Sequence, residues 1–361
     1  MMQTDDIARL CKRKDKMKAE RGTFETHWQD LTNYVLPNSS DFNTKRSKGD
    51  KRTSLVYDST GIHSNEMLAA GLHGMLTNPA QEWFSLRIMN DVKKIAEDEE
   101  VKTWLEETTQ AITSELSAPD VAFASHIHEY YLSLCSIGTA VMFIGEPTNR
   151  EGLSFRTIHV DEILIAENFD GIVDTVFRCC KMPLRQIVQR WGEDSLSVRQ
   201  KRSWEKKEFD KEFEILHCVY PREDYQKGKK ARTMLPIASL YLDEKERHIL
   251  DEGGFDEMPY TVSRWAKATG EIFGRSPAMT ALPDIKMLQE MMKTTIKAAQ
   301  KIVDPPLLVP DDGVLGPVRT IPGGLNYYRA SSAARIEPLR TGGHISISFA
   351  MIEDVRNLVR L

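Results

Sequence analysis

Apolar residues recur at helical spacing in two long stretches of the chain. In the first 36 residues they appear every three or four positions among charged ones, which predicts a helix over 5–36 that Pro37 ends. A second stretch begins at Pro277 and runs to 303, where Pro305 and Pro306 prevent its continuation. Shorter stretches with the same period predict helices at 60–77, 91–116, 121–137 and from about 348 onward.

Alternating apolar and polar residues predict strands between these helices. They lie at 83–89, 140–145, 155–160, 174–180, 212–220, 236–242 and 257–264. Pro183 opens a further helix that we expect to run through Trp191, and the stretch 195–211 after it is heavily charged. The strands that follow it form a β-rich insert between two helices, which we expect to be a separate unit. Together these elements predict an α+β fold in which helices predominate.

Composition narrows the class of protein. At roughly 100–200 residues per domain, 361 residues should form two or three units, and 41% hydrophobic with 28% charged residues is ordinary for a globular chain. A formal net charge of −5 argues against a protein that grips nucleic acid with its whole surface. A mean hydropathy of −0.41 and the lack of an apolar run of about 18 residues predict no transmembrane helix. Five cysteines without regular spacing favour reduced thiols in a cytosolic compartment.

Candidate chemistry is sparse. The sequence contains no nucleophile elbow, phosphate-binding loop, zinc-protease motif or dinucleotide-binding motif. His126 and His128 could bind a metal from one face of a strand, but their stretch is predicted to be helical, where side chains two positions apart diverge. His217 and Cys218 lie on a predicted strand and point to opposite faces, which argues against a catalytic dyad. We therefore expect no catalytic residue, no metal site and no cofactor.

The stretch 277–303 carries a narrow basic stripe. At about 100° per residue, four lysines fall with Glu290 within roughly 80° of the helix circumference, and the apolar residues cluster on another face. These lysines are Lys286, Lys293, Lys297 and Lys301. The stripe is either an ordinary solvated face or a surface that faces a polyanion or a water-filled passage. A second basic segment is the turn that contains Lys227, Lys229, Lys230 and Arg232, which faces either a partner or only solvent.

A series of short motifs occurs in an order typical of one protein family. The motifs are His27-Trp28 through Tyr34 to Pro37, Asp58-Ser59-Thr60-Gly61, Asn78-Pro79 with Trp83-Phe84, Pro259-Tyr260, Arg264-Trp265, Gly270-Glu271, Gly274-Arg275-Ser276-Pro277, the stretch 281–286 with Pro283 and Asp284, Pro305-Pro306 and Gly323-Gly324. Each is weak alone, but their order across nearly the whole chain is specific. On these residues the chain resembles the podovirus (T7-like) head-to-tail connectors, the portal proteins of tailed bacteriophages.

The resemblance implies a structural function. Portal subunits form a ring, a dodecamer, at one capsid vertex, through which double-stranded DNA is packaged by the terminase motor and later ejected. The ring also docks a tail adaptor and contacts capsid and scaffolding proteins. It has no catalytic activity of its own and does not act at a membrane. The implied location is the virion, with assembly in the host cytoplasm.

The resemblance also implies a division of the chain. Residues 1–180 correspond to a wing, 181–211 to a first stem helix, 212–273 to a small β-containing clip, 274–303 to a second stem helix, and 304–361 to the tunnel-loop and returning wing region. Family members continue past residue 361, so the C-terminal crown is expected to be missing. The lysine stripe would line the channel, and the basic turn would contact a partner of the clip. The alternatives are a scaffold or adaptor without a channel, and a metal-dependent nucleic-acid-processing enzyme.

Overall fold

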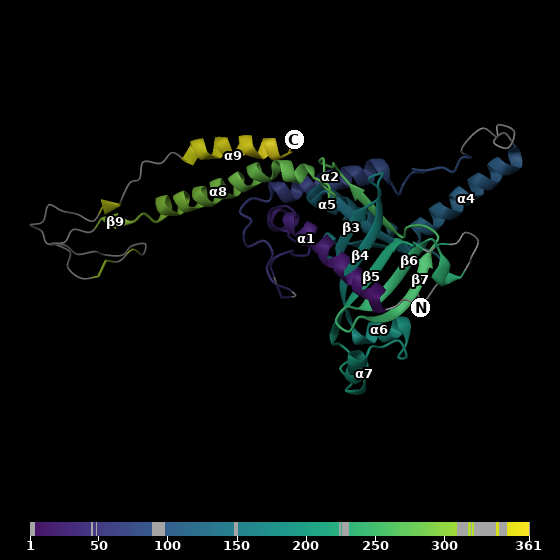
Figure 1. Ribbon diagram of the computed structural model, residues 1–361. Coiled ribbons are helices and arrows are strands. Elements are labelled where there is room, and N and C mark those ends of the chain that lie inside the picture. The colour runs from purple at the N-terminus through teal and green to yellow at the C-terminus, as the bar shows by residue number, and fades with distance from the viewer. Residues whose placement is uncertain are drawn as a thin grey trace, which may run out of the picture. The chain divides into compact units, whose positions relative to one another are not determined.

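The protein divides into two units in its computed structural model (Figure 1). Unit 1 comprises Met1–Leu55 and Ile62–Thr280, and unit 2 comprises Val56–Gly61 and Ala281–Leu361. The structure describes residues 4–44, 46–47, 49–88, 98–147, 151–223, 225, 231–308, 317–318, 320, 337–338 and 345–360.

Helices of the described residues follow the predicted apolar periodicity closely. Their bounds are α1 (Thr4–Tyr34), α2 (Thr60–Leu76), α4 (Glu99–Ser117), α5 (Phe123–Ile137), α6 (Leu184–Trp191), α7 (Val198–Glu205), α8 (Pro277–Val303) and α9 (Ile345–Arg360). The two longest of these helices, α1 and α8, lie where the prolines and the spacing of apolar residues predicted them. Mixed helix and sheet confirms the α+β class.

A five-stranded antiparallel sheet forms the centre of unit 1. Its order is β3 (Ile163–Glu167), β4 (Val173–Pro183), β5 (Glu212–Pro221), β6 (Ile237–Asp243) and β7 (His248–Phe255). Alternate residues of β5 serve opposite faces: Leu216 and Cys218 pack with α1, whereas Phe213 and Ile215 pack with α6. Helix α1 lies across the first of these faces (Figure 1).

A second sheet of unit 1 has the order β2 (Ser154–Ile158), β1 (Thr139–Gly145) and β8 (Tyr260–Arg264). Helix α5 packs against it through a core that contains Tyr131, Cys135 and Met142. The two sheets are joined by a buried hydrogen bond of 2.7 Å between Nδ1 of His217 on β5 and the hydroxyl of Tyr260 on β8. His217 and Cys218 therefore serve opposite faces, as their strand position predicted.

The expectation of one stem helix over 181–211 is wrong. Two eight-residue helices, α6 and α7, occupy this stretch, and β4 extends to Pro183. Gly192 ends α6 with a φ of +80°, a conformation that favours glycine. Ser197 then starts α7 with a capping box, in which Ser197 and Gln200 satisfy each other's backbone N–H groups. These local stop and start signals outweigh the helical composition of the stretch.

The expectation that the β-rich insert forms a separate unit is also wrong. Strand β5 pairs with β4 from Val176↔Val219 to Pro183↔Glu212, and β8 pairs with β1, so both strands complete sheets begun earlier in the chain. Strand β7 was not predicted, because its glycines weaken the alternation. The predicted strand at 83–89 is absent over its described residues, 83–88, and Trp83 instead packs near Phe123 at a ring-centroid distance of 6.1 Å.

Unit 2 consists of the segment 56–61, most of α8, the helix α9 and a two-residue pair of strands, β9 (Leu307–Leu308) and β10 (Glu337–Pro338). Helix α9 runs alongside α8 (Figure 1). Leu288 of α8 and Ile352 and Val355 of α9 form the small core between the two helices. Burying these side chains favours the packing of α9 on α8.

Candidate functional site

The motif Gly274-Arg275-Ser276-Pro277 fixes the start of α8. Ser276 is buried, and its Oγ accepts a hydrogen bond of 3.0 Å from the backbone N–H of Met279. The same hydroxyl donates to the carbonyl of Ser136, near the end of α5, at 2.6 Å. Ser is a preferred N-cap residue, and Pro is favoured at the first helical position because its missing N–H would be unpaired there anyway.

Two glycines allow this helix start to lie against the turn after α5. Gly138 has a φ of +86°, and a Cβ there would lie 2.6 Å from the carbonyl oxygen of Gly274. A Cβ on Gly274 would in turn collide with the carbonyl oxygen of Gly138. The N–H of Gly274 donates to Oγ1 of Thr139 at 2.9 Å. The motif residues Gly274 and Ser276 therefore hold the first turn of α8 against the end of α5 within unit 1.

Arg275 of the same motif is exposed, and its Nε donates to Oε2 of Glu271 at 2.8 Å. The Glu271 carboxylate raises the pKa of the Arg275 guanidinium, and Arg275 lowers the pKa of Glu271. Pro283 is exposed inside α8, and Asp284 is half-buried. These contacts support a structural interpretation of the motif.

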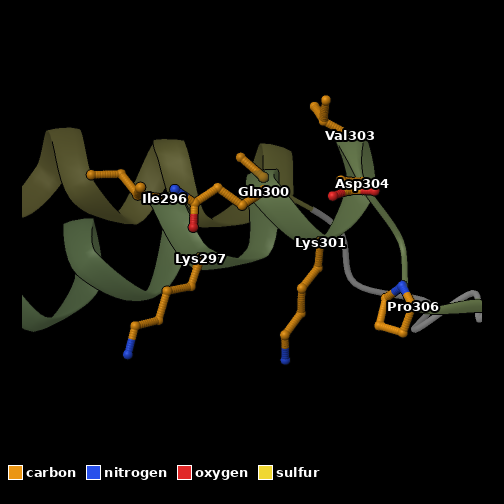
Figure 2. A pocket seen from close by; sticks show the side chains of 8 residues that line it. Ile296, Lys297, Gln300, Lys301, Val303, Asp304 and Pro306 are labelled. Atoms are coloured by element: carbon orange, nitrogen blue, oxygen red, sulfur yellow. The ribbon is translucent and has the colours of Figure 1, made fainter. Parts of the chain in front are cut away.

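The four lysines of the stripe have different surroundings. Lys286 and Lys293 are half-buried, and Lys293 Nζ lies 3.0 Å from Glu290 Oε1 and 5.9 Å from the centre of the Tyr57 ring. Lys297 and Lys301 are exposed and project to the same side of α8, away from Val303 (Figure 2). The structure thus brings Lys297 and Lys301 together as an exposed cationic pair one turn apart.

The segment 56–61 is clamped between the two helices of unit 2. Oε1 of Gln289 accepts hydrogen bonds from the N–H groups of Tyr57 at 2.6 Å and Asp58 at 2.9 Å, and its Nε2 donates to the Asp58 carbonyl at 2.7 Å. The Asp58 carboxylate accepts from Arg356 Nη2 at 2.8 Å and from the N–H of Thr60 at 2.9 Å. Gln289 of α8 and Arg356 of α9 are thereby connected through one acidic residue.

The charges of this clamp stabilise each other. Burial alone would raise the pKa of Asp58, but the hydrogen bonds from Thr60 and Arg356 outweigh it and keep that pKa below its usual value. Hydrogen bonds to Asp58 and Glu353 raise the pKa of Arg356. The pair therefore stays ionised at neutral pH, and the residues of the Asp58-Ser59-Thr60-Gly61 motif that carry it have a structural function.

Beyond the start of α9, the apolar face of the C-terminal part of α8 is open. A groove of about 740 Å³ follows this part of the helix and is lined by Ile296, Ala299 and Val303 together with Lys297 and Lys301 (Figure 2). Val303 is 85% exposed, whereas Leu288, on the same helical face nearer the start, is fully buried. The apolar face predicted for 285–303 is therefore covered only in its first half.

Of the four basic residues proposed to contact a partner of the clip, the structure describes Arg232. Lys227, Lys229 and Lys230 lie outside the described residues. Arg232 begins a short 3₁₀ helix, and its Nη2 donates to Oδ2 of Asp251 on β7 at 2.8 Å. Arg232 thus braces the edge of the five-stranded sheet.

A serine, a histidine and an aspartate meet in unit 1 in an arrangement that the sequence did not reveal. Ser39 Oγ hydrogen-bonds Nε2 of His159, and Nδ1 of His159 lies 2.8 Å from Oδ1 of Asp161. The backbone N–H of Asp161 also donates to that Nδ1 at 3.2 Å, so the imidazole caps the 3₁₀ helix Val160–Glu162. We interpret the contact as a structural one that holds the loop after α1 against this 3₁₀ helix. Its members are 120 residues apart, and no sequence spacing could find it.

Across the described part of the chain, no group of three or more His, Cys, Asp or Glu side chains is placed to hold a metal ion. His126 and His128 both lie on α5, as predicted. Among the helices of the described residues, none is long and apolar enough to cross a bilayer.

Comparisons with known proteins identify the family. The family described as bacteriophage head to tail connecting protein matches residues 8–360. The chain is 28% identical over 358 residues to the probable portal protein of Bordetella phage BPP-1, covering 97% of this chain and 63% of that protein. It is 29% identical over 323 residues to the portal protein of Salmonella phage epsilon15, covering 88% and 57%. The chain thus spans about three-fifths of the length of these relatives.

Among solved structures, the neck of an empty GTA particle computed with C6 symmetry matches 90% of this chain and 73% of its own chain. The identity is 10% and the TM-score is 0.35, too low to carry an argument. The match over residues 8–360 confirms the resemblance seen in the motifs. This chain belongs to the bacteriophage head-to-tail connecting protein family.

Proposed function

We propose that this protein is a portal subunit, which forms a ring at one capsid vertex through which double-stranded DNA enters and leaves. The observation that carries the proposal is the family match over residues 8–360, with two relatives named portal protein. The proposed partners are further copies of the chain in a dodecamer, DNA held without sequence specificity, the terminase motor, a tail adaptor, and capsid and scaffolding proteins.

We assign the DNA-facing surface to the lysine stripe of α8, and above all to its exposed pair. A conduit must let DNA slide, and each phosphate contact that releases counterions adds to the free energy needed to move the duplex. The chain is acidic overall, with a formal charge of −5, and of the four stripe lysines Lys297 and Lys301 are exposed while Lys286 and Lys293 are half-buried. Sparse cationic contacts on an acidic ring would centre the duplex and keep friction low.

The parts of the subunit follow from this proposal. We assign residues 1–180 to the wing, 274–303 to the stem helix beside the channel, and 304–361 to the tunnel-loop and returning wing region. The assignments of 181–211 to the first stem segment and 212–273 to the clip stay predictions. If they hold, the first stem segment is the broken pair α6 and α7.

Imaging of the full-length gene product by negative-stain electron microscopy tests the proposal. We expect rings with a central hole wide enough for a double helix. Compact particles without a hole would instead support a scaffold or adaptor. DNA cleavage that requires a divalent cation would support a nucleic-acid-processing enzyme.

A charge-reversal pair tests the lysine assignment. We expect Lys297→Glu with Lys301→Glu to leave ring formation intact and to alter DNA packaging or retention. The matched control is Lys12→Glu with Lys16→Glu, an equally spaced exposed pair on α1 in the proposed wing, which should behave as the unchanged protein. Equal behaviour of the two pairs would contradict a DNA-facing role of α8.

A further inference from the structure

The turn between β3 and β4 carries the most exposed aromatic side chain of the described residues. Phe169 is 104% exposed relative to its reference state, and the nearby Ile172 is 62% exposed. Large apolar side chains exposed together typically mark a surface that binds another molecule. Aromatic anchors of this kind contribute most of the free energy at many protein interfaces.

This turn, which we call the hairpin tip (168–172), is held rigidly. The N–H of Ile172 donates to Oδ1 of Asn168 at 2.9 Å, and the N–H of Asn168 donates back to the carbonyl of Ile172 at 2.9 Å. Gly171 supplies the positive φ, +75°, that the turn requires. The backbone of the tip is therefore ordered before binding, and only the Phe169 side chain loses freedom on insertion.

Two basic residues at and just after the end of β8, in the same chain, brace the tip. Nη2 of Arg264 donates to the carbonyl of Gly171 at 3.0 Å, and Nζ of Lys267 lies 2.7 Å from Oε1 of Glu167, which also pairs with Arg264. Arg264 and Lys267 thus neutralise the charge of Glu167 at the base of the tip. Asp170, beside Phe169, is exposed and is the carboxylate nearest to it in the turn.

The same unit contains a cavity of matching chemistry. It has a volume of about 360 Å³, none of its lining side chains is charged, and an aromatic and apolar wall faces polar residues that include Thr77, Gln81 and Thr113. Its aromatic wall is formed by Trp83 and Phe123, whose rings stack at 6.1 Å with an interplanar angle of 5°, and Pro79 and Leu116 extend the apolar lining. A cavity of about 150 Å³ already accommodates benzene, so this one has room for a phenyl ring against its aromatic wall.

One rim of this cavity is the N-terminus of α5. The helix begins after Ala122, whose φ is +50°, and no side chain caps it. The first N–H groups of a helix have no partner within it, and the positive end of the helix dipole favours a carboxylate there. Ala124 and Ser125, in the first turn, are exposed at this rim.

We propose that Phe169 of one copy inserts into the cavity beside Trp83 and Phe123 of a neighbouring copy, with Asp170 at the N-terminus of that copy's α5. The occupant is a second copy because one chain carries both the aromatic anchor, with Asp170 beside it, and a cavity whose rim is the positive end of the α5 dipole. Phe169 is fully exposed, so the contact is not made within the chain. An anchor on one surface and its receptor on another make a head-to-tail contact, the kind that closes a ring. The inference rests on the proposed portal ring.

Mixed disulfides test the contact directly. Phe169→Cys in one tagged full chain and Ala124→Cys in a differently tagged chain are combined under mild oxidation. We expect a covalent dimer that carries both tags. The control replaces Phe169→Cys by Val198→Cys, since Val198 is 62% exposed on α7. Mixed dimers no more abundant than with this control would overturn the inference.

Association strength gives a second measurement. We expect Phe169→Ser to weaken subunit association at least tenfold in analytical ultracentrifugation, with an unchanged circular dichroism spectrum, and Val198→Ser to leave it unchanged. Equal association of both variants would overturn the inference. The portal proposal is tested separately: rings that persist without the crosslink contradict only this interface, whereas an unchanged protein that forms no ring contradicts the portal function itself.

Discussion

Single residues fix the geometry at the start of α8. Gly274 and Gly138 lie so close that a methyl group on Gly274 would collide with the Gly138 carbonyl and lie 2.9 Å from Cβ of Arg264. We expect Gly274→Ala to lower the free energy of unfolding by about 1–3 kcal/mol, the usual cost of overpacking. Thermal or urea unfolding measures it.

The control for this substitution is Gly22→Ala within α1. A Cβ there has open space, and alanine is the better helix former, so this variant should gain about 0.5–1 kcal/mol. Two Gly-to-Ala changes of opposite sign would establish that the close approach, and not the loss of glycine, is responsible. A neutral Gly274→Ala would show that the helix start can shift away from the turn.

The buried His217 gives the protein a defined dependence on pH. Burial lowers the pKa of His217, and the charges of Arg190 and Arg178 lower it further. In the unfolded chain the imidazole has a pKa of about 6.5 and takes up a proton below it. Unfolding should therefore become easier as the pH falls below about 6.5, by up to about 1.4 kcal/mol per pH unit.

The variant His217→Gln isolates this effect, because glutamine can hydrogen-bond Tyr260 and Ser239 but does not titrate. Urea unfolding from pH 5 to 8 should give a shallower slope for the variant below pH 6.5, whatever its stability at pH 8. If the free energy of unfolding varied with pH in the same way for both proteins, the conclusion that His217 is buried in its neutral form would be wrong.

At the scale of elements, α9 is attached to α8 by a small apolar core and to the segment 56–61 by the ion pair of Arg356 with Asp58. We expect Arg356→Met to destabilise unit 2 by about 1–3 kcal/mol, because the Asp58 carboxylate stays buried after losing its partner. Amide hydrogen exchange should then accelerate along α9. Arg360→Met is the matched control, since Arg360 is 55% exposed and lies 3.3 Å from Glu353, and it should change stability by less than about 0.5 kcal/mol. Equal exchange in the two variants would assign the attachment of α9 to its apolar core alone.

The elements also show what sequence could predict and what it could not. Local signals located α1 and α8, because prolines stop both and their apolar spacing is regular. Composition failed at 181–211, where Gly192 and Ser197 break the helix. The lysine stripe could be predicted because it is a periodic pattern along the sequence. The clamp around Asp58 could not, because Asp58 contacts Gln289 and Arg356 across 231 and 298 residues. Strand pairing, such as that of β4 with β5, is non-local in the same way.

At the scale of the whole molecule, the proposed ring should hold DNA in a salt-dependent way. Each phosphate contact contributes about −0.9 to the slope of log affinity against log salt concentration. We expect Lys297→Glu with Lys301→Glu to make that slope shallower for double-stranded DNA bound by assembled rings, and Lys12→Glu with Lys16→Glu to leave it unchanged. Filter binding at 50–200 mM salt measures the slopes, and identical slopes would remove these lysines from the DNA path.

In the proposed channel, the four-residue spacing of the exposed Lys297 and Lys301 along α8 would have a mechanical consequence. Four residues of α-helix rise about 6 Å, whereas phosphates along one strand of a duplex repeat about every 3.4 Å. The two periods do not match, so tiers of ammonium groups cannot all meet phosphates at the same instant. Attraction lost at one level would be regained at another as the duplex advances, so the proposed ring would oppose the genome with a nearly even resistance and no deep resting position.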